Sequence, residues 1–201
     1  MAGARTQSRS FDAAFYRRFY EDRRTAVSDA REVHRLCEFV LAYLRFLRIP
    51  VRSVLDVGCG LGRWKKALAR QRPGISYLGV EVSDYLCDRF GWRKGSAVDY
   101  SPGRRFDLVI CQSVLQYLGD EDAERAIANL ARLCRGALYL EVLTRGDWES
   151  NCDRRRTDGN VNLRQGSWYR RRLARGFWNC GGGVFVRRTR PVALYELEAL
   201  P

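Results

Sequence analysis

A glycine-containing bend preceded by a carboxylate is the segment of this chain best suited to bind a ligand. It follows an apolar stretch and contains Asp56, Gly58, Cys59, Gly60 and Gly62. Glycine lets the backbone turn tightly and approach a ligand without a Cβ in the way. A helix that begins after the last glycine would point its free amide groups at the same ligand. We therefore expect a binding loop here.

The residues around the bend indicate which kind of ligand it binds. The spacing is GxGxG followed by Arg63, whereas a dinucleotide fingerprint requires glycine or alanine at that position for close helix–strand packing. The carboxylate of Asp56 would also repel a pyrophosphate. A carboxylate suits a positively charged ligand, such as a sulfonium that also carries an amino group. The bend therefore favours a cationic amino-acid–nucleoside ligand.

Strands and helices are expected to alternate on both sides of the bend. Continuous apolar strands that alternate with amphipathic helices indicate a parallel sheet covered on both faces. Two strands close together near the end would form an antiparallel pair. The sequence thus predicts an α/β, Rossmann-like doubly wound sheet that is mostly parallel, with an antiparallel edge strand and helices on both faces. The expected strands cover residues 51–57, 76–81, 96–99, 106–112, 137–143, 184–187 and 192–197, and the expected helices cover 28–46, 62–71, 84–90, 121–134 and 167–177.

The N-terminal segment is expected to cover the site. Phe11, Phe15 and Phe19 recur every four residues and so share one face of a helix. We expect residues 1–49 to form an N-terminal helical lid segment before a domain over 50–201. The alternative is that these aromatic rings pack on the domain.

A second decoration is the long polar stretch at about 145–166. It is longer than most loops and is expected to be an insertion above the carboxyl edge of the sheet. Loops carry specificity on a shared scaffold, so we expect aromatic residues of the lid, of this region and near the fourth strand to contact the substrate. These expected contacts are Tyr16, Tyr20, Tyr117, Trp148 and Tyr169.

The segment VLDVGCGLG at the bend resembles motif I of the class I S-adenosylmethionine-dependent methyltransferases. The similarity extends from about Phe11 to the end of the chain. It implies S-adenosylmethionine as the cofactor, with Asp56 on the side of its methionine part. In that family an acidic residue at the end of the second strand binds both ribose hydroxyls, and the matching residue in YLGVEVSD is Glu81.

The resemblance also covers the third and fourth strands. Asp99 in GSAVDY, with Tyr100 beside it, would face the adenine amino group, and the alternative is a turn residue before Ser101. Gln112 in FDLVICQSVLQYL would approach the cofactor, and the alternative is a plain strand terminus. The cofactor-binding residues that the resemblance implies are Asp56, Gly58, Cys59, Gly60, Gly62, Glu81, Val82, Asp99, Tyr100 and Gln112.

The motifs of the sequence identify neither the methyl acceptor nor a catalytic group. Residues 111–114 lack the NPPY-like motif that methyltransferases use on amino groups of bases or glutamine, which disfavours adenine-N6 and glutamine acceptors. Our working hypothesis is a small-molecule acceptor. No strong base stands out, because His34 is expected to pack on a helix and Cys59 to fill the loop without activation. One alternative is an RNA or protein methyltransferase, suggested by the arginine clusters at 154–156 and 170–172. Another is a catalytically inactive cofactor-binding regulator, suggested by the missing base.

Composition sets broader limits. The chain has 201 residues, of which 46% are hydrophobic, which fits one domain with additions. No apolar run reaches the roughly 20 residues that span a bilayer, and no secretory signal is evident, so we expect a cytoplasmic protein without a membrane partner. The net charge of +13 keeps a nucleic-acid partner possible. Seven scattered cysteines and one histidine predict neither a metal site nor a disulfide framework. The sequence leaves the oligomeric state unknown.

Overall fold

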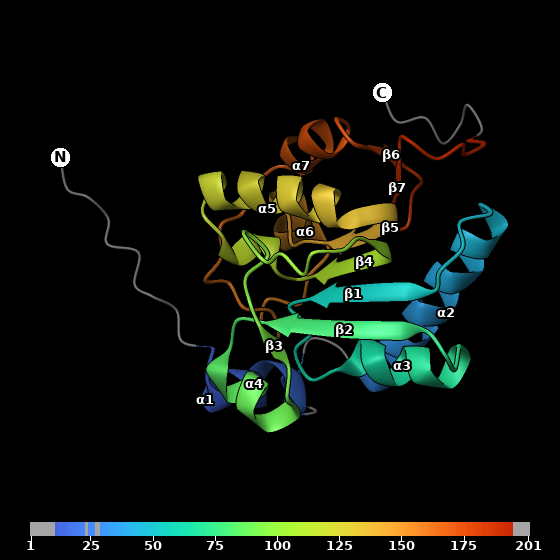
Figure 1. Cartoon of the computed structure of the whole chain (residues 1–201). Coiled ribbons are helices and arrows are strands. Elements are labelled where there is room, and N and C mark those ends of the chain that lie inside the picture. The colour runs from blue at the N-terminus through green and yellow to red at the C-terminus, as the bar shows by residue number, and fades with distance from the viewer. Residues whose placement is uncertain (1–10, 23, 27–28, 195–201) are drawn as a thin grey trace.

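A seven-stranded sheet forms the centre of a computed structural model that describes residues 11–22, 24–26 and 29–194 (Figure 1). The strands are β1 (Ser53–Val57), β2 (Ser76–Glu81), β3 (Arg93–Lys94), β4 (Phe106–Gln112), β5 (Cys134–Glu141), β6 (Phe177–Asn179) and β7 (Val184–Arg187). Their order in the sheet is β3-β2-β1-β4-β5-β7-β6. The first five pair in parallel, whereas β7 runs antiparallel to both β5 and β6. The predicted Rossmann-like sheet with an antiparallel edge is confirmed.

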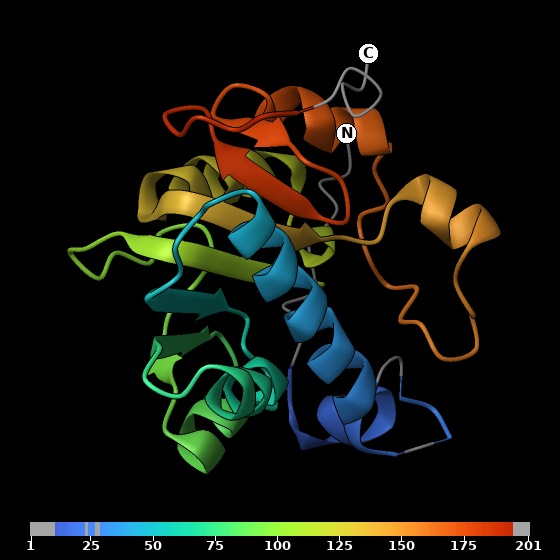
Figure 2. The same cartoon turned by 90° about the vertical axis from the view of Figure 1, so that its right-hand side faces the viewer.

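Helices cover both faces because the central strands are apolar on both sides. The main helices are α2 (Ala30–Phe46), α3 (Arg63–Gln71), α4 (Asp84–Phe90), α5 (Asp120–Leu133) and α7 (Gly166–Leu173). Successive residues of β1 point to opposite faces, so Val54 packs with α2 and α3 while Leu55 packs with α5 and α7. Figure 2 shows α2 lying across the first face. Burial on both faces explains the near-continuous apolar runs of the strands.

Two decorations lie at the edge of the sheet to which the arrowheads of β1 and β2 point (Figure 1). The N-terminal one consists of α1 (Ala13–Tyr16) and the π-helical turn η1 (Arg17–Glu21). The other is the insertion, which contains α6 (Arg145–Ser150), and the 3-10 turn η2 (Leu115–Tyr117) follows β4 at the same edge. Ligands of open α/β sheets bind at this edge, so these segments surround the expected site.

Helix α2 belongs to the core rather than to a lid. The sequence placed it in the N-terminal lid segment, 1–49. Its stripe of Val33, Cys37, Val40 and Leu44 is buried in the same cluster as β1 and α3. A stripe with this three- and four-residue spacing is wide enough to pack along a sheet. Among the described residues before α2, the segment that reaches the carboxyl edge therefore starts at Phe11 and ends before this helix.

The third strand is shorter and earlier than predicted. β3 is Arg93–Lys94, whereas 96–99 forms a turn in which the Tyr100 amide donates to the Ser96 carbonyl at 3.0 Å. β3 can pair only with the last two residues of β2, Val80 and Glu81. The chain then bends back toward the site. The prediction of a strand at 96–99 was wrong, because the local sequence does not show that β3 pairs with only the last two residues of β2.

The antiparallel edge uses a different partner strand from the predicted one. Helix α7 ends at Leu173, and Phe177 starts β6, which pairs with β7. The three glycines 181–183 all have positive φ and turn the chain between these strands. Residues 192–194 form no strand, and the rest of the strand expected at 192–197 lies outside the described residues. The glycine turn joins β6 to β7, so the partner strand of the hairpin lies before residue 184 rather than after residue 187.

One buried carboxylate ties the amino ends of three central strands together. Asp107 in β4 accepts hydrogen bonds from the amides of Arg52 and Ser53 at 2.9 Å each, and from the Ser53 hydroxyl at 3.0 Å. Its other oxygen accepts from Nε of Arg135 in β5 at 2.7 Å. Burial alone would raise the pKa of Asp107, but the hydrogen bonds from Arg135, Arg52 and Ser53 outweigh it and hold the pKa below its usual value. The ionised form therefore stabilises the fold.

We expect Asp107→Asn to lower the free energy of unfolding at pH 7 by about 2–4 kcal/mol, because the amide places a donor against other donors. A depressed pKa contributes stability above the unfolded value of about 3.9, and the contribution disappears as pH falls through the folded pKa. The difference in the free energy of unfolding between wild type and Asp107→Asn should therefore shrink below about pH 4. Urea unfolding across this pH range measures it, with the exposed Asp88→Asn as control. Equal stability of wild type and Asp107→Asn at pH 7 would contradict the assignment.

Candidate functional site

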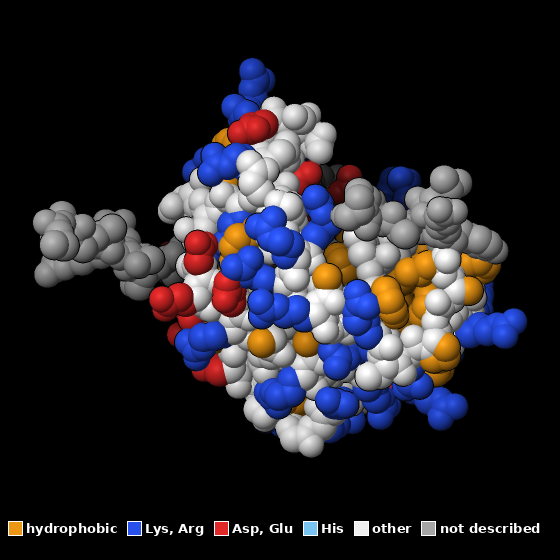
Figure 3. Space-filling view, turned by 90° about the horizontal axis from the view of Figure 1, so that it is seen from above, with side chains coloured by type: hydrophobic (Ala, Val, Ile, Leu, Met, Phe, Trp, Pro, Cys, Tyr) orange, Lys and Arg blue, Asp and Glu red, His pale blue; other side chains and the backbone are white. Residues whose placement is uncertain are grey.

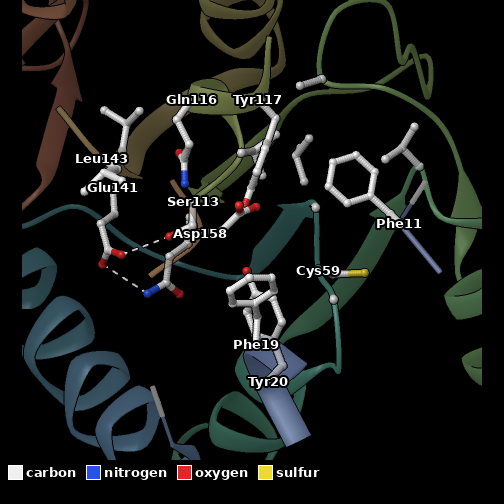
Figure 4. A pocket seen from close by; sticks show the side chains of 18 of the residues that line it. Phe11, Phe19, Tyr20, Cys59, Ser113, Gln116, Tyr117, Glu141, Leu143 and Asp158 are labelled. Atoms are coloured by element: carbon white, nitrogen blue, oxygen red, sulfur yellow. Dashed lines mark hydrogen bonds between the residues drawn. The ribbon is translucent and has the colours of Figure 1, made fainter. Parts of the chain in front are cut away.

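A cavity of about 680 Å³ opens at the carboxyl ends of the parallel strands. Its walls come from the glycine bend, the ends of β2, β4 and β5, the aromatic N-terminal segment, the turn η2 and the insertion. Figure 4 shows Glu141, Ser113 and Gln116 on one side of this space and the rings of Phe19 and Tyr20 on another. Segments that are far apart in sequence therefore meet at one site, which has the size of typical small-molecule pockets.

The glycine bend has the conformation that its sequence predicts. Gly58, Gly60 and Gly62 have φ values of 74°, 53° and 69°, in the region that disfavours residues with a Cβ. A Cβ on Gly58 would also collide with the side chain of Val114. The amides of Gly58 and Cys59 donate to the carbonyl of Val80 at 2.8 and 3.1 Å, which fixes the bend against β2. Gly58, Cys59 and Gly60 of the bend line the cavity, whereas the buried Gly62 does not.

The Glu81 carboxylate lies beside this bend, as predicted. The residue ends β2 and is 3% exposed. One oxygen accepts from the Gly60 amide at 2.9 Å, and the other accepts from the amides of Val82 and Ser83 at 2.8 and 3.1 Å. Three backbone donors thus hold a charged group in a fixed orientation at the cavity wall. Val82 also lines the cavity.

Asp56 supplies a second carboxylate at the base of the cavity. It is 2% exposed and accepts a hydrogen bond from the Tyr77 hydroxyl at 2.6 Å. Burial raises the pKa of Asp56 to about 7, the Tyr77 hydrogen bond opposes this rise, and the negative charge of Glu81 adds to it. A carboxyl group in this state ionises readily when a cation binds next to it. This matches the charged ligand that the sequence predicts.

The ends of β4 and β5 form a polar cluster on the opposite wall. Gln112 accepts from the Trp64 indole at 2.8 Å and donates to Glu141 at 3.0 Å. The hydroxyls of Ser113 and Tyr139 donate to the same Glu141 carboxylate at 3.2 and 3.0 Å. Gln112 therefore lines the cavity as expected, but its side chain is oriented by Glu141 and Trp64.

The aromatic N-terminal segment covers the cavity. Phe11 and Phe15 contact Tyr117 of η2 at ring-centroid distances of 5.3 and 6.3 Å. The hydroxyl of Ser83 donates to the Phe11 carbonyl at 2.5 Å, and Arg63 donates to the Tyr20 carbonyl at 2.5 Å. The predicted contacts Tyr16, Tyr20 and Tyr117 all line the cavity. The rings of this segment therefore both line the cavity and pack on the domain, so they fit each of the two alternatives.

Buried hydroxyl and thiol groups of the cavity stay neutral. Burial, followed by the charge of Glu81, raises the pKa of Tyr16 far above its usual value, and burial does the same for Tyr20. Burial also raises the pKa of the Cys59 thiol, with Asp56 and Glu81 adding to it. Deprotonation of these three groups is therefore unfavourable, and Cys59 is a small buried residue rather than a nucleophile.

Two residues assigned to the adenine side lie elsewhere. Asp99 is exposed and does not line the cavity, and the Tyr100 ring packs beside Gly95 in the core under α5. Ser96 and Ala97 line the cavity instead. The reason is the early end of β3, because the chain reaches the cavity three residues before Asp99.

Two expected aromatic substrate contacts also lie outside the cavity. Tyr169 is 3% exposed in the core on the α5 and α7 side of the sheet, where its hydroxyl accepts from Arg164 at 3.0 Å. The Trp148 ring packs inside the insertion, with Arg154 over it at 5.2 Å and Gly159 against it. The insertion reaches the cavity through polar residues instead, namely Asp147, Asn151, Cys152, Thr157 and Asp158.

Sequence reasoning missed several polar residues of the site. Ser113 has a φ of 56°, which directs the chain after β4 into the cavity wall, and Glu141 ends β5. Gln116 is 4% exposed, and its side-chain oxygen has no hydrogen-bond partner among the described residues. The position of Glu141 at the carboxyl end of an expected strand was a usable signal. Nothing local in the sequence marked Gln116 or Asp158.

Neither a metal site nor a membrane-spanning helix occurs among the described residues. No cluster of three or more His, Cys, Asp or Glu side chains is arranged to hold a metal ion there. Within the same residues, no helix has both the length and the apolar character required to cross a membrane. His34 lies on α2, where its carbonyl accepts from Gln71 at 3.0 Å, and it does not line the cavity.

Comparison with known proteins agrees with this geometry. Residues 55–136 match the family model described as a methyltransferase domain. The chain is 30% identical over 108 residues to a ubiquinone biosynthesis O-methyltransferase of Coxiella burnetii, covering 47% of this chain and 44% of that protein. It is 31% identical over 121 residues to a malonyl-[acyl-carrier protein] O-methyltransferase of Magnetococcus marinus, covering 52% and 44%. The chain thus spans less than half the length of these curated relatives.

Solved structures share the fold at lower identity. Magnesium protoporphyrin IX methyltransferase from Synechocystis PCC 6803, with bound SAH, superposes with a TM-score of 0.58 and 19% identity, covering 83% of this chain and 86% of that one. An amino pentose methyltransferase from Micromonospora echinaspora, with bound SAM, gives 0.57 and 19%, covering 78% and 92%. Residues 55–136 thus resemble a methyltransferase domain, and the sheet that contains them has the fold of these solved methyltransferases.

Proposed function

We propose that the protein binds S-adenosylmethionine and transfers its methyl group to a small-molecule acceptor. The observation that carries this proposal is the Glu81 carboxylate, which three backbone amides fix beside a glycine bend at the carboxyl edge of the sheet. The curated relatives named above methylate small molecules or a carrier-bound acyl group, according to their names. These relatives support the same class of reaction for this chain.

The residues present suit that cofactor. Gly58 and Gly60 line the cavity without side chains, so their backbone can approach the methionine part closely. Glu81 is placed to accept hydrogen bonds from two vicinal hydroxyls of a ribose. Asp56 offers a negative charge to the ammonium or the sulfonium of the cofactor. Ser96 and Ala97, which line the cavity, are assigned to the adenine side in place of Asp99. Gln112 and Val82 complete the wall.

The chain's own residues supply the remaining requirements of methyl transfer. When bound, the cofactor supplies an activated methyl group on a sulfonium, so the protein must align an acceptor and exclude water. The rings of Phe11, Phe15 and Phe19 form an apolar cover over the cavity and keep water out. The polar wall around Glu141 and Gln112 orients the acceptor against the cofactor side.

A small acceptor fits this enclosure better than a macromolecule. The cavity of about 680 Å³ must hold both the cofactor and the acceptor, and the aromatic segment closes over it. Arginines of α5 and α7, by contrast, lie on the outer face seen in Figure 3. None of the seven cysteines, which all lie in the described residues, forms a disulfide, and this supports a cytoplasmic location.

The first test concerns Glu81. We expect Glu81→Gln to weaken binding of S-adenosylhomocysteine by about ten- to a hundredfold, since hydrogen bonds from two hydroxyls to a charged acceptor are lost. Isothermal calorimetry measures the affinity, and thermal melting checks that the variant is folded. Glu121→Gln, on the exposed side of α5, is the matched control and should bind normally. Unchanged affinity in a folded Glu81→Gln protein would refute the assigned role.

The second test uses the titration of Asp56. Its pKa of about 7 in the free protein means that binding a cation at low pH first requires loss of a proton. Wild type should therefore lose up to about tenfold affinity for S-adenosylmethionine per pH unit below 7, relative to Asp56→Asn. The cofactor's own titration affects both proteins equally, so their ratio isolates Asp56. The two affinities should converge near pH 5.5 and diverge at pH 8, and a ratio independent of pH would count against the charge interaction.

A further inference from the structure

We infer that the methyl acceptor is a small primary or secondary amine, held as an ammonium between the aromatic cover and the acidic wall of the cavity. This inference rests on the proposed function, because it concerns the acceptor half of the same cavity. It assigns recognition of the acceptor to Gln116, Glu141 and Asp158, which all line the cavity.

The first argument is the sign of the charge. Five carboxylates line the cavity, namely Asp56, Glu81, Glu141, Asp147 and Asp158. Among the described lining residues, Arg63 is the one cation, and its guanidinium donates to the Tyr20 carbonyl of the cover. The protein as a whole carries a charge of +13, so the acidic lining is a local property of the site. Such a cavity attracts a cation and repels an anion.

The second argument is an unpartnered acceptor atom. Gln116 is 4% exposed and lines the cavity, and its Oε1 has no hydrogen-bond partner among the described groups. A buried acceptor left unsatisfied is unfavourable, so the site gains from a ligand that donates a hydrogen bond there. An ammonium carries up to three donors and no acceptor. Gln116 lies close in sequence to Ser113, which orients Glu141 on the same wall (Figure 4).

The third argument is the ring-lined cover. Phe15, Tyr16, Phe19 and Tyr20 line the space together with Tyr117. Faces of aromatic rings attract ammonium groups, more strongly when water is excluded. Rings on one side and carboxylates on the other form a site for a cation with apolar substituents.

The cavity's own phenols indicate why an amine is favoured over a hydroxyl. Burial and nearby negative charge raise the pKa of Tyr16 and of Tyr20 far above the usual value. A phenol or alcohol acceptor in the same space would also resist losing its proton. Its oxygen must develop negative charge to attack the methyl group, so its reaction would be unfavourable there. An ammonium becomes neutral when it loses its proton, and the neutral nitrogen is itself the nucleophile.

The transfer step balances with residues that the cavity supplies. The bound ammonium gives one proton to the Asp158 carboxylate, which leaves a neutral amine with a lone pair. That nitrogen attacks the sulfonium methyl, so a nitrogen–carbon bond forms while the carbon–sulfur bond breaks and its electron pair returns to sulfur. The products are a methylated ammonium and the neutral thioether. Glu141 already accepts hydrogen bonds from Gln112, Ser113 and Tyr139, so it anchors the ammonium.

The test compares matched acceptors with the full chain. Benzylamine, benzyl alcohol, phenol and benzoate form one series, and glucosamine, glucose and glucuronate form another. Release of S-adenosylhomocysteine reports turnover, and calorimetry on the S-adenosylhomocysteine-loaded protein reports acceptor binding independently of turnover. We expect the amine of a series to bind and react at least about tenfold better than its neutral and anionic counterparts. Preference for a phenol, an alcohol or a carboxylate, or no binding of either amine, would overturn the inference.

Variants separate this inference from the proposed function. Gln116→Leu should raise the KM for the amine by about tenfold and leave binding of S-adenosylhomocysteine unchanged. Asp158→Asn should lower kcat and move the pH profile of kcat to higher pH, because the free amine must then come from solution. Glu149→Gln, exposed in the same insertion, is the control. Normal KM in Gln116→Leu together with a normal pH profile in Asp158→Asn would overturn the inference. If the wild-type protein did not bind S-adenosylhomocysteine at all, that result would instead refute the proposed function.

Discussion

The fixed position of the Glu81 carboxylate is the constraint on which the rest of the site depends. Its hydrogen bond from Gly60 joins the end of β2 to the bend after β1. This contact requires both strands to end at the same level, which the pairing of Val57 with Val80 provides. A buried carboxylate is unfavourable without such donors, so strand register, bend and charge are maintained together.

A second property of the molecule is the separation of its charges. Two of the cavity carboxylates are held by neutral donors, Glu81 by backbone amides and Glu141 by hydroxyl and amide side chains. Neutral donors satisfy the hydrogen bonds without cancelling the charge, so the cavity keeps a negative potential. Apart from Arg63, the described arginines lie outside the cavity lining, and Arg172, for example, stacks on Trp168 at 3.6 Å and pairs with Glu124. The basic surface and the acidic site therefore coexist in one small domain.

The two edges of the sheet divide stability from ligand binding. At the amino edge, Asp107 joins β1, β4 and β5 through four hydrogen bonds to Arg52, Ser53 and Arg135. At the carboxyl edge, the aromatic cover is attached by ring contacts and side-chain hydrogen bonds, such as that from Arg63 to Tyr20, rather than by strand pairing. Segments attached in this way open at lower free energy than paired strands. A ligand can thus enter without disturbing the sheet.

The sequence by itself determined the sheet class, the glycine bend, Asp56 and Glu81, because strand periodicity and positive-φ glycines are local properties. It failed for Asp99 and for Tyr169, whose positions depend on where β3 ends and on which face α7 buries. Only the tertiary structure placed Gln116, Glu141 and the insertion's carboxylates in one cavity, because side chains from η2, β5 and a distant loop converge there. Such convergence is set by packing between elements, and no spacing within a single segment encodes it.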